Sequence, residues 1–332
     1  MMNTFNKEYQ YFITGAAGFI GFYLAKYLLE AGARVIGFDN INDYYEISLK
    51  EERLAQLTAY ENFVFIKGDL ADKDAVFQVF KENKIDIAIN LAAQAGVRHS
   101  IDHPDVYIQS NVVGFFHILE ACRNYPVKHL LYASSSSVYG GNEKVPFAVG
   151  DPVDHPVSLY AATKKSNELM AYSYSKLYGI PLTGLRFFTV YGPWGRPDMA
   201  CFKFARQMAT GKPIQIYNHG DMYRDFTYID DVIEGVARML CNPPHPDQAG
   251  VSYKVYNIGN NHPESLLYFV ELLEKHLGIS AQKEFLPMQP GDVYRTYADV
   301  SELKQNFGYQ PETTLEEGIK RFARWFRERE MA

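Results

Sequence analysis

The sequence is poor in the residues that mark several classes of protein. It has only three cysteines, Cys122, Cys201 and Cys241, at no spacing typical of a disulfide framework or a metal cluster, which fits a reducing compartment. No apolar stretch approaches the roughly 18 residues of a membrane span. Residues 1–8 also lack the apolar run that a signal peptide needs. We therefore expect a globular protein of the cytoplasm that binds no membrane.

Excess positive charge is absent as well. Thirty-three basic residues face 39 acidic ones, a formal net charge of −6, so we expect no nucleic-acid partner. With 47% hydrophobic and 22% charged residues, the chain is too apolar and too balanced in charge to be disordered. Tryptophan is scarce, with two residues, but there are 25 tyrosines and 22 phenylalanines, most of which we assign to the core.

Short apolar segments alternate with helical patterns over the first two-thirds of the chain. Strands are expected at 11–13, 34–38, 63–66, 85–91, 129–133 and 182–187. Helices are expected at 18–30, 48–57, around 75–80, 107–122 and 158–178. This alternation predicts an α/β fold with a doubly wound parallel sheet of the Rossmann type.

The regular alternation ends after residue 188. Turn-rich loops at 192–197 and 242–246 are followed by shorter helical patterns at 202–209, 231–240, 266–276 and 315–329. We expect Thr313 and Glu316 to form a capping box for the last helix. The pattern predicts a first domain over 1–187 and a smaller mixed α/β domain over 188–332. Whether segments near 225–260 return to the first domain stays open.

A glycine-rich turn follows the first strand. Gly15, Gly18 and Gly21 stand between a strand and a helix, where glycines permit a tight turn and let a pyrophosphate approach the helix N-terminus. Asp39 ends the second strand, where a carboxylate accepts from ribose hydroxyls and repels a 2′-phosphate. No lysine or arginine immediately follows it. The pattern predicts NAD rather than NADP as the cofactor.

Two further segments, 68–70 and 91–93, fall at strand ends, where such sheets bind ligands. For each of them a helix cap or ordinary packing is an open alternative. The residues expected to contact NAD are Gly15, Gly18, Phe19, Ile20, Gly21, Asp39, Asn40, Asp69, Leu70, Leu91, Ala92, Ala93, Asn111, Tyr160 and Lys164.

Tyr160 and Lys164 stand one helical turn apart, on the same face of the helix expected at 158–178. A free tyrosine has a pKa of about 10, too high for a general base at neutral pH. An adjacent ammonium and a nicotinamide's positive charge would both lower that pKa. A surface Tyr/Lys pair is the alternative. The serine run 134–137, at the end of the fifth strand, adds hydroxyls that can reach a substrate oxygen.

The glycine motif, Asp39, the serine run and the Tyr160/Lys164 pair, in this order, resemble the extended short-chain dehydrogenase/reductase family over essentially the whole chain. The resemblance implies a Rossmann domain that holds NAD, a C-terminal domain that binds a UDP-sugar, and the catalytic set Ser135, Tyr160 and Lys164.

Within this family the positions that match Ser136 and Ser137 separate the chemistries. Relatives that eliminate water or remove CO2 carry carboxylates there, so the two serines imply a 4-epimerase. Segments 92–98, 134–140, 159–165 and 186–199 are similar to those of relatives that act on uronates. The implied reaction interconverts UDP-glucuronate and UDP-galacturonate through a transient 4-keto intermediate, in nucleotide-sugar supply for polysaccharide synthesis. The alternatives are a 4-epimerase of UDP-glucose and UDP-galactose and a non-catalytic NAD-binding regulator.

The same resemblance assigns residues to the substrate. Arg224 and Arg295 are expected on the diphosphate, Asp292 on the ribose, Lys203, Gln215 and Tyr217 around the uracil, and Arg98, Arg196, Ser136, Ser137 and Thr189 on the sugar and its carboxylate. Structural salt bridges are the alternative for both Arg98 and Arg196. His99 and His103 lack a third ligand, so we expect no metal. The family also implies a homodimer, built from the helices at 107–122 and 158–178.

Overall fold

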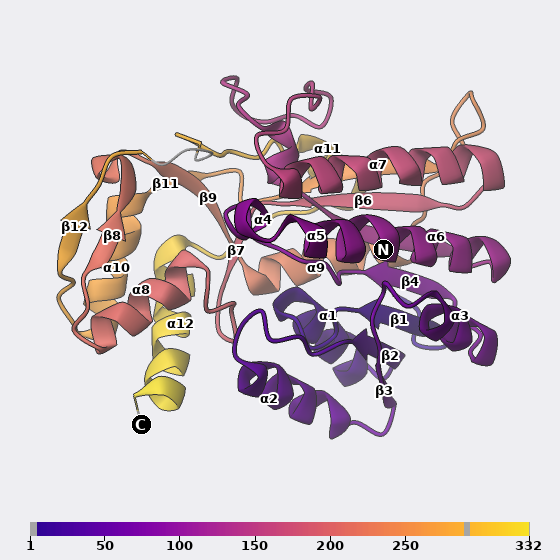
Figure 1. Cartoon of the computed structure of the whole chain (residues 1–332), viewed down its shortest axis with the longest axis horizontal. Coiled ribbons are helices and arrows are strands. Elements are labelled where there is room, and N and C mark those ends of the chain that lie inside the picture. Colours follow the sequence, from indigo (N-terminus) through magenta and orange to yellow (C-terminus); the bar gives the residue numbers. More distant parts are fainter. Residues whose placement is uncertain (1–4, 289–292, 332) are drawn as a thin grey trace.

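Seven parallel strands form one large sheet in the computed structural model, which describes residues 5–288 and 293–331 (Figure 1). They are β1 (Gln10–Thr14), β2 (Arg34–Asp39), β3 (Phe63–Lys67), β4 (Ile87–Asn90), β5 (His129–Ser135), β6 (Leu182–Phe187) and β10 (Tyr253–Ile258). Their order across the sheet is β3-β2-β1-β4-β5-β6-β10. The expected doubly wound parallel sheet is confirmed, and β10 joins it at the edge beside β6.

Helices cover both faces of this sheet. One face carries α1 (Phe19–Glu30), α2 (Ile47–Thr58) and α9 (Ile229–Leu240), and the other carries α3 (Lys73–Glu82), α6 (Gly114–Asn124) and α7 (Leu159–Tyr178). Successive strand residues point to opposite faces. In β1, for example, Tyr11 and Ile13 enter one core while Phe12 enters the other. Burial on both sides explains why the strands read as nearly continuous apolar runs.

The C-terminal part contains two small sheets. Strands β7 (Thr189–Tyr191), β9 (Tyr223–Tyr228) and β11 (Pro263–Ser265) form one, in the order β11-β9-β7, and β8 (Ile214–Ile216) pairs with β12 (Lys283–Phe285). The helices of this part are α8 (Ala200–Ala209), α10 (Leu266–Leu277), α11 (Ser301–Phe307) and α12 (Leu315–Glu330).

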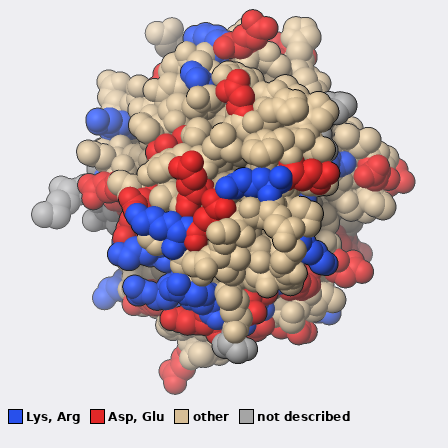
Figure 2. Space-filling view, turned by 90° about the vertical axis from the view of Figure 1, so that its left-hand side faces the viewer, with Lys and Arg blue, Asp and Glu red and all other residues tan. Residues whose placement is uncertain are grey.

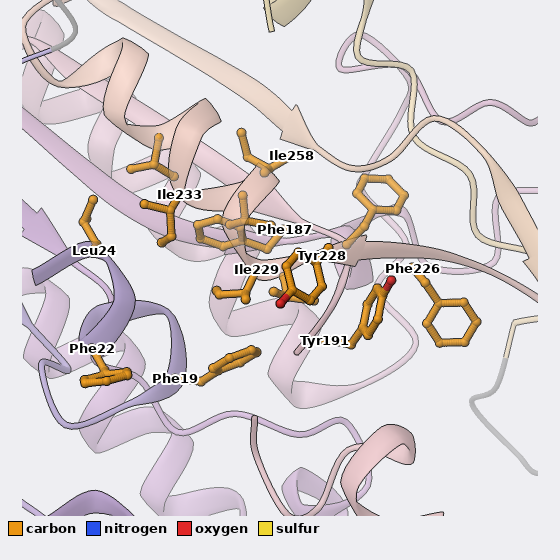
Figure 3. Close-up of a cluster of buried hydrophobic side chains, with 14 of the residues drawn as sticks. Phe19, Phe22, Leu24, Phe187, Tyr191, Phe226, Tyr228, Ile229, Ile233 and Ile258 are labelled. Atoms are coloured by element: carbon orange, nitrogen blue, oxygen red, sulfur yellow. The ribbon is translucent and has the colours of Figure 1, made fainter. Parts of the chain in front are cut away.

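The core of this part is continuous with one core of the large sheet. Figure 3 shows Phe19 and Phe22 of α1 in the same buried cluster as Phe187 of β6, Tyr228 of β9 and Ile229 of α9. The two parts of the chain therefore bury a shared apolar surface.

One of two local expectations is confirmed and the other was wrong. The helix expected at 107–122 is present, because α5 (Pro104–Tyr107), a π-helical turn over Ile108–Val113 and α6 follow one another without a break, and the short α4 (His99–Asp102) precedes them. The cap of α12 is Thr314, whose hydroxyl accepts from Glu317 N. Thr313, expected as the cap, lies one residue earlier, and its backbone N–H donates to the carboxylate of Asp231.

Within the described ranges, no helix is both long enough and apolar enough to cross a bilayer.

A buried ion pair joins β6 to α7. The Arg186 guanidinium donates through Nε and a terminal nitrogen to both carboxylate oxygens of Glu168, each at 2.8 Å. The hydroxyl of Ser134 donates to the same carboxylate at 2.7 Å. Arg186 also donates to the Tyr139 hydroxyl at 3.0 Å. Each charge is thus fully engaged, and removal of either would leave the other buried without compensation.

We expect Glu168→Gln to lower the free energy of unfolding by about 3 kcal/mol, because it leaves the Arg186 cation buried without its counter-charge. The matched control is Glu30→Gln, which removes an exposed carboxylate that lies 4.0 Å from Lys26 and should change stability by less than about 0.5 kcal/mol. Urea unfolding of both variants measures the difference. Equal stabilities would contradict this account of the pair.

Candidate active site

A cavity of about 370 Å³ opens at the carboxyl ends of the central strands. Twelve residues expected to contact NAD line it: Gly15, Gly18, Phe19, Ile20, Gly21, Asp39, Asn40, Asp69, Leu70, Leu91, Ala92 and Ala93. Ser135, Tyr160 and Lys164 line the same cavity, as do Ser136, Ser137, Thr189 and Arg196. The fold therefore brings the expected cofactor, catalytic and sugar residues together.

The glycine turn is shaped for close backbone approach. Gly15 has φ +72°, and a Cβ there would lie 2.7 Å from the backbone nitrogen of Ala92. A Cβ on Gly21 would lie 2.0 Å from the carbonyl oxygen of Gly15. No side chain caps α1 at Gly18, so the first N–H groups of the helix face the cavity side where a pyrophosphate binds. These residues fit a dinucleotide.

Asp39 is held in place at the end of β2. Its Oδ2 accepts from Ala17 N at 3.1 Å and its Oδ1 accepts from Ile41 N at 2.8 Å. Each carboxylate oxygen has further acceptor capacity for a ribose hydroxyl, and the negative charge disfavours a 2′-phosphate. The geometry of the site thus fits NAD.

The three residues expected to be catalytic lie where β5 ends and α7 begins. Burial raises the pKa of Tyr160, while a hydrogen bond with Ser135 and the positive charge of Arg196 lower it. Lys164 lies one turn further along α7, with Nζ 6.0 Å from the centre of the Tyr160 ring. Its Nζ donates to Ala133 O at 2.8 Å, and burial lowers its pKa to about 8. Ser158 fixes the start of α7, because its side chain accepts from Ala161 N.

A cation stands beside this centre. Arg196, in the turn after β7, donates through Nε to Asp198 Oδ1 at 3.0 Å, and the Tyr44 hydroxyl donates to Asp198 Oδ2 at 3.2 Å. Burial alone would lower the pKa of Arg196, but Asp198 raises it above its usual value. The salt bridge considered as an alternative role for Arg196 is therefore present, and its guanidinium also lines the cavity near Tyr160.

The sequence was compared with known proteins. Residues 11–259 match the model of the NAD dependent epimerase/dehydratase family. The chain belongs to this family. Protein CapI of Staphylococcus aureus is 53% identical, over 95% of this chain and 98% of that protein. A probable UDP-glucuronate 4-epimerase of Rhizobium meliloti is 46% identical, over 96% of both chains. The fold is similar to a crystal structure of UDP-glucuronic acid 4-epimerase from Bacillus cereus in complex with UDP-glucuronic acid and NAD. The TM-score is 0.88 and the identity 34%, over 96% of this chain and 99% of that one.

Several expected residues of this family member lie outside the cavity lining. Asn111 is buried behind it: its side chain accepts from Gln94 N at 2.8 Å and donates to Gln94 O and to the hydroxyl of Thr163. It therefore ties the segment after β4 to α7. Lys203 is exposed on α8.

The remaining substrate residues form two groups. The Arg98 guanidinium lies 5.0 Å from the ring centre of Tyr217, whose hydroxyl donates to the side chain of Gln215. Arg224 donates to Tyr223 O at 2.9 Å, and the Arg295 guanidinium lies 4.6 Å from the Tyr223 ring. Asp292 lies outside the described residues.

Sequence reasoning missed other residues of the cavity. Tyr44 and Lys50 line it but follow β2 in a segment without a recognisable motif. Gln94 and Met199 also line it and fall inside the segments 92–98 and 186–199 that carry the family resemblance, so position in those segments was the available signal. Among the described residues, no three His, Cys, Asp or Glu side chains gather where a metal could bind.

We expect Lys164→Met to move the acid limb of the pH profile of kcat to higher pH. Below about pH 8 the Lys164 ammonium is charged and favours the Tyr160 phenolate, so its loss raises the pKa of Tyr160. At pH 7 kcat should fall by about tenfold or more and recover in part as the pH rises. Initial rates measured across the pH range test this. Lys165→Met, which removes a partly exposed ammonium 3.8 Å from Asp154, should leave the profile in place, and an unmoved profile in Lys164→Met would refute the assignment.

Proposed function

We propose that this chain is an NAD-dependent 4-epimerase that interconverts UDP-glucuronate and UDP-galacturonate. The observation that carries the proposal is the placement of Arg196 in the same cavity as Tyr160. A guanidinium at that point suits a sugar that bears a carboxylate at C5. The similarity to UDP-glucuronate 4-epimerases supports the same substrate.

The chain's own residues account for proton transfer. Tyr160, as the phenolate, takes the proton of the C4 hydroxyl, and Ser135 shares that hydrogen bond. The Lys164 ammonium favours the phenolate. The glycine turn and Asp39 would hold NAD, which would supply an acceptor for the C4 hydride and a donor that returns it to the opposite face of the sugar. Tyr160 then gives its proton back to the C4 oxygen, so neither the tyrosine nor the cofactor is consumed.

Inversion requires the 4-keto sugar to present its other face within the cavity. The contacts to the sugar ring must therefore break during the turn, while other residues keep the diphosphate bound. We assign the diphosphate to Arg224 and Arg295, which lie together beside Tyr223. Residues 1–187 would then supply the dinucleotide site and residues 188–332 most of the UDP-sugar site, while β10 and α9 of the second segment belong to the large sheet and its helix layer.

The 4-keto uronate carries a chemical hazard, because it is a β-keto acid. Such an acid loses CO2 when its carboxylate bond aligns with the carbonyl π system. We assign Arg196 and Thr189, which line the cavity, to holding the carboxylate out of that alignment. Ser136 and Ser137 add hydroxyls there without adding an acid or a base for elimination.

Purified protein mixed with UDP-glucuronate should give UDP-galacturonate. Proton NMR of the mixture identifies the products. We expect Tyr160→Phe to lower kcat by about a hundredfold or more, because it removes the general base. UDP-xylose or a free 4-keto pentose as the main product would refute the proposal. Faster turnover of UDP-glucose would favour the neutral-sugar alternative. Undiminished turnover by Tyr160→Phe would reject the catalytic assignment and favour a regulator.

We also propose that the chain is a homodimer of the cytoplasm. Helices α6 and α7 pack side by side (Figure 1) and present apolar side chains to solvent, among them Phe116, Leu169 and Leu177, the last of which is 69% exposed. Large exposed apolar patches mark interaction surfaces. The cysteines are free thiols, which fits a reducing compartment.

Light scattering should give the wild-type chain twice the monomer mass of 37.9 kDa. We expect the double variant Phe116→Glu/Leu177→Glu to sediment as the monomer, because it places two charges where each copy would bury apolar surface. Phe285→Glu, a charge added at an exposed residue of β12, is the control and should remain dimeric. A monomeric wild type would disprove the dimer without affecting the reaction.

A further inference from the structure

One arginine outside the site is fully buried and joins two loops that border the cavity. Arg53 of α2 is 0% exposed. One terminal nitrogen donates to Ala17 O at 2.9 Å and to the Tyr45 hydroxyl at 2.7 Å. The other donates to Trp194 O at 2.7 Å and to Gly195 O at 3.2 Å. All four acceptors are uncharged, so these bonds do not include the counter-charge that usually accompanies a buried cation.

The carbonyl groups that accept from Arg53 belong to two loops that border the cavity. Ala17 belongs to the glycine turn, and its own N–H donates to Asp39. Trp194 and Gly195 directly precede Arg196. Trp194 has φ +57°, a conformation that a bulky residue adopts only when its surroundings hold it there. The Arg53 guanidinium thus spans the gap between the dinucleotide turn and the loop that carries Arg196.

We propose that Arg53 is a positioning residue, which holds the 194–196 turn against the glycine turn so that Arg196 meets the substrate carboxylate. This inference rests on the proposed function. A planar guanidinium suits the task because its fixed fork donates in two directions at once, which a single ammonium nitrogen does not. The expected consequence is selectivity: Arg53 should matter for a UDP-sugar with a carboxylate and not for a neutral one.

Two surface ion pairs also link α2 to the C-terminal part. Arg206 of α8 pairs with Glu46, and Arg329 of α12 pairs with Glu52 at 2.6 Å. Figure 2, which faces the side of the C-terminal part, shows acidic and basic side chains interspersed over its lower half. The Glu52 side chain is 44% exposed, and its carboxylate accepts from Arg329 of α12. Glu52 therefore offers a control next to Arg53 on the same helix.

The test compares the binding of two ligands by calorimetry with NAD-loaded protein. Arg53→Lys keeps the charge but loses the fork. We expect this variant to raise the Kd of UDP-glucuronate by about tenfold, because the carboxylate of the uronate uses Arg196. The Kd of UDP-glucose, which has no carboxylate, should change by less than about twofold. In the reaction, KM for UDP-glucuronate should rise with little change in kcat. The share of product that has lost CO2 should also rise. Glu52→Gln should leave all these values unchanged.

A double-mutant cycle separates positioning from a general structural role. If Arg53 acts through Arg196, Arg53→Lys should add little to the loss of uronate binding already caused by Arg196→Met. Equal weakening of both UDP-sugars, no weakening, or full additivity would overturn the proposal. So would failure of both Arg53→Lys and Arg53→Met to fold, since the residue would then serve the fold itself. If the wild-type protein binds UDP-glucuronate but does not epimerise it, the proposed function fails while the binding comparison still judges Arg53.

Discussion

The close approach of the Gly15 backbone to the end of β4 is the constraint on which the rest of the site depends. No side chain fits between Gly15 and Ala92, so the glycine turn and the 91–93 segment form one wall of the cavity. The turn then fixes its neighbours. Ala17 N orients the Asp39 carboxylate, and Ala17 O receives Arg53. One tight turn thus sets the positions of the ribose acceptor and, through Arg53, of the loop that carries Arg196.

Charge in the cavity serves two purposes. In the proposed mechanism Tyr160 becomes a phenolate, although burial raises its pKa and so opposes ionisation. Arg196 helps to offset that cost, and we assign the same guanidinium to the substrate carboxylate. Asp198 accepts from Arg196 and from the Tyr44 hydroxyl. A uronate would therefore meet a guanidinium that Asp198 already orients, and little further ordering of Arg196 would be needed on binding.

Local patterns predicted the sheet, the glycine turn and Asp39, because each depends on spacing within one strand–turn–helix unit. Features that depend on contacts between residues far apart in the sequence could not be predicted in this way. The cap of α12 is one residue later than expected, and the residue before it bonds Asp231, a contact across 82 positions that no local pattern shows. Lys50 and Arg53 read as ordinary helix residues among charged neighbours, and only the packing of α2 against the glycine and 194–196 turns places them inside. The position of Asn111 behind the cavity wall likewise depends on its tertiary partners Gln94 and Thr163.

The place of β10 in the sheet has a consequence for biosynthesis. Because β10 pairs with β6 from a point well after it in the chain, the hydrogen-bonding edge of β6 stays unpaired on the ribosome until Tyr253–Ile258 has emerged. Such an edge is a template for pairing with foreign strands. A nascent chain halted before Tyr253 would therefore carry the other six strands of the sheet with the edge of β6 exposed.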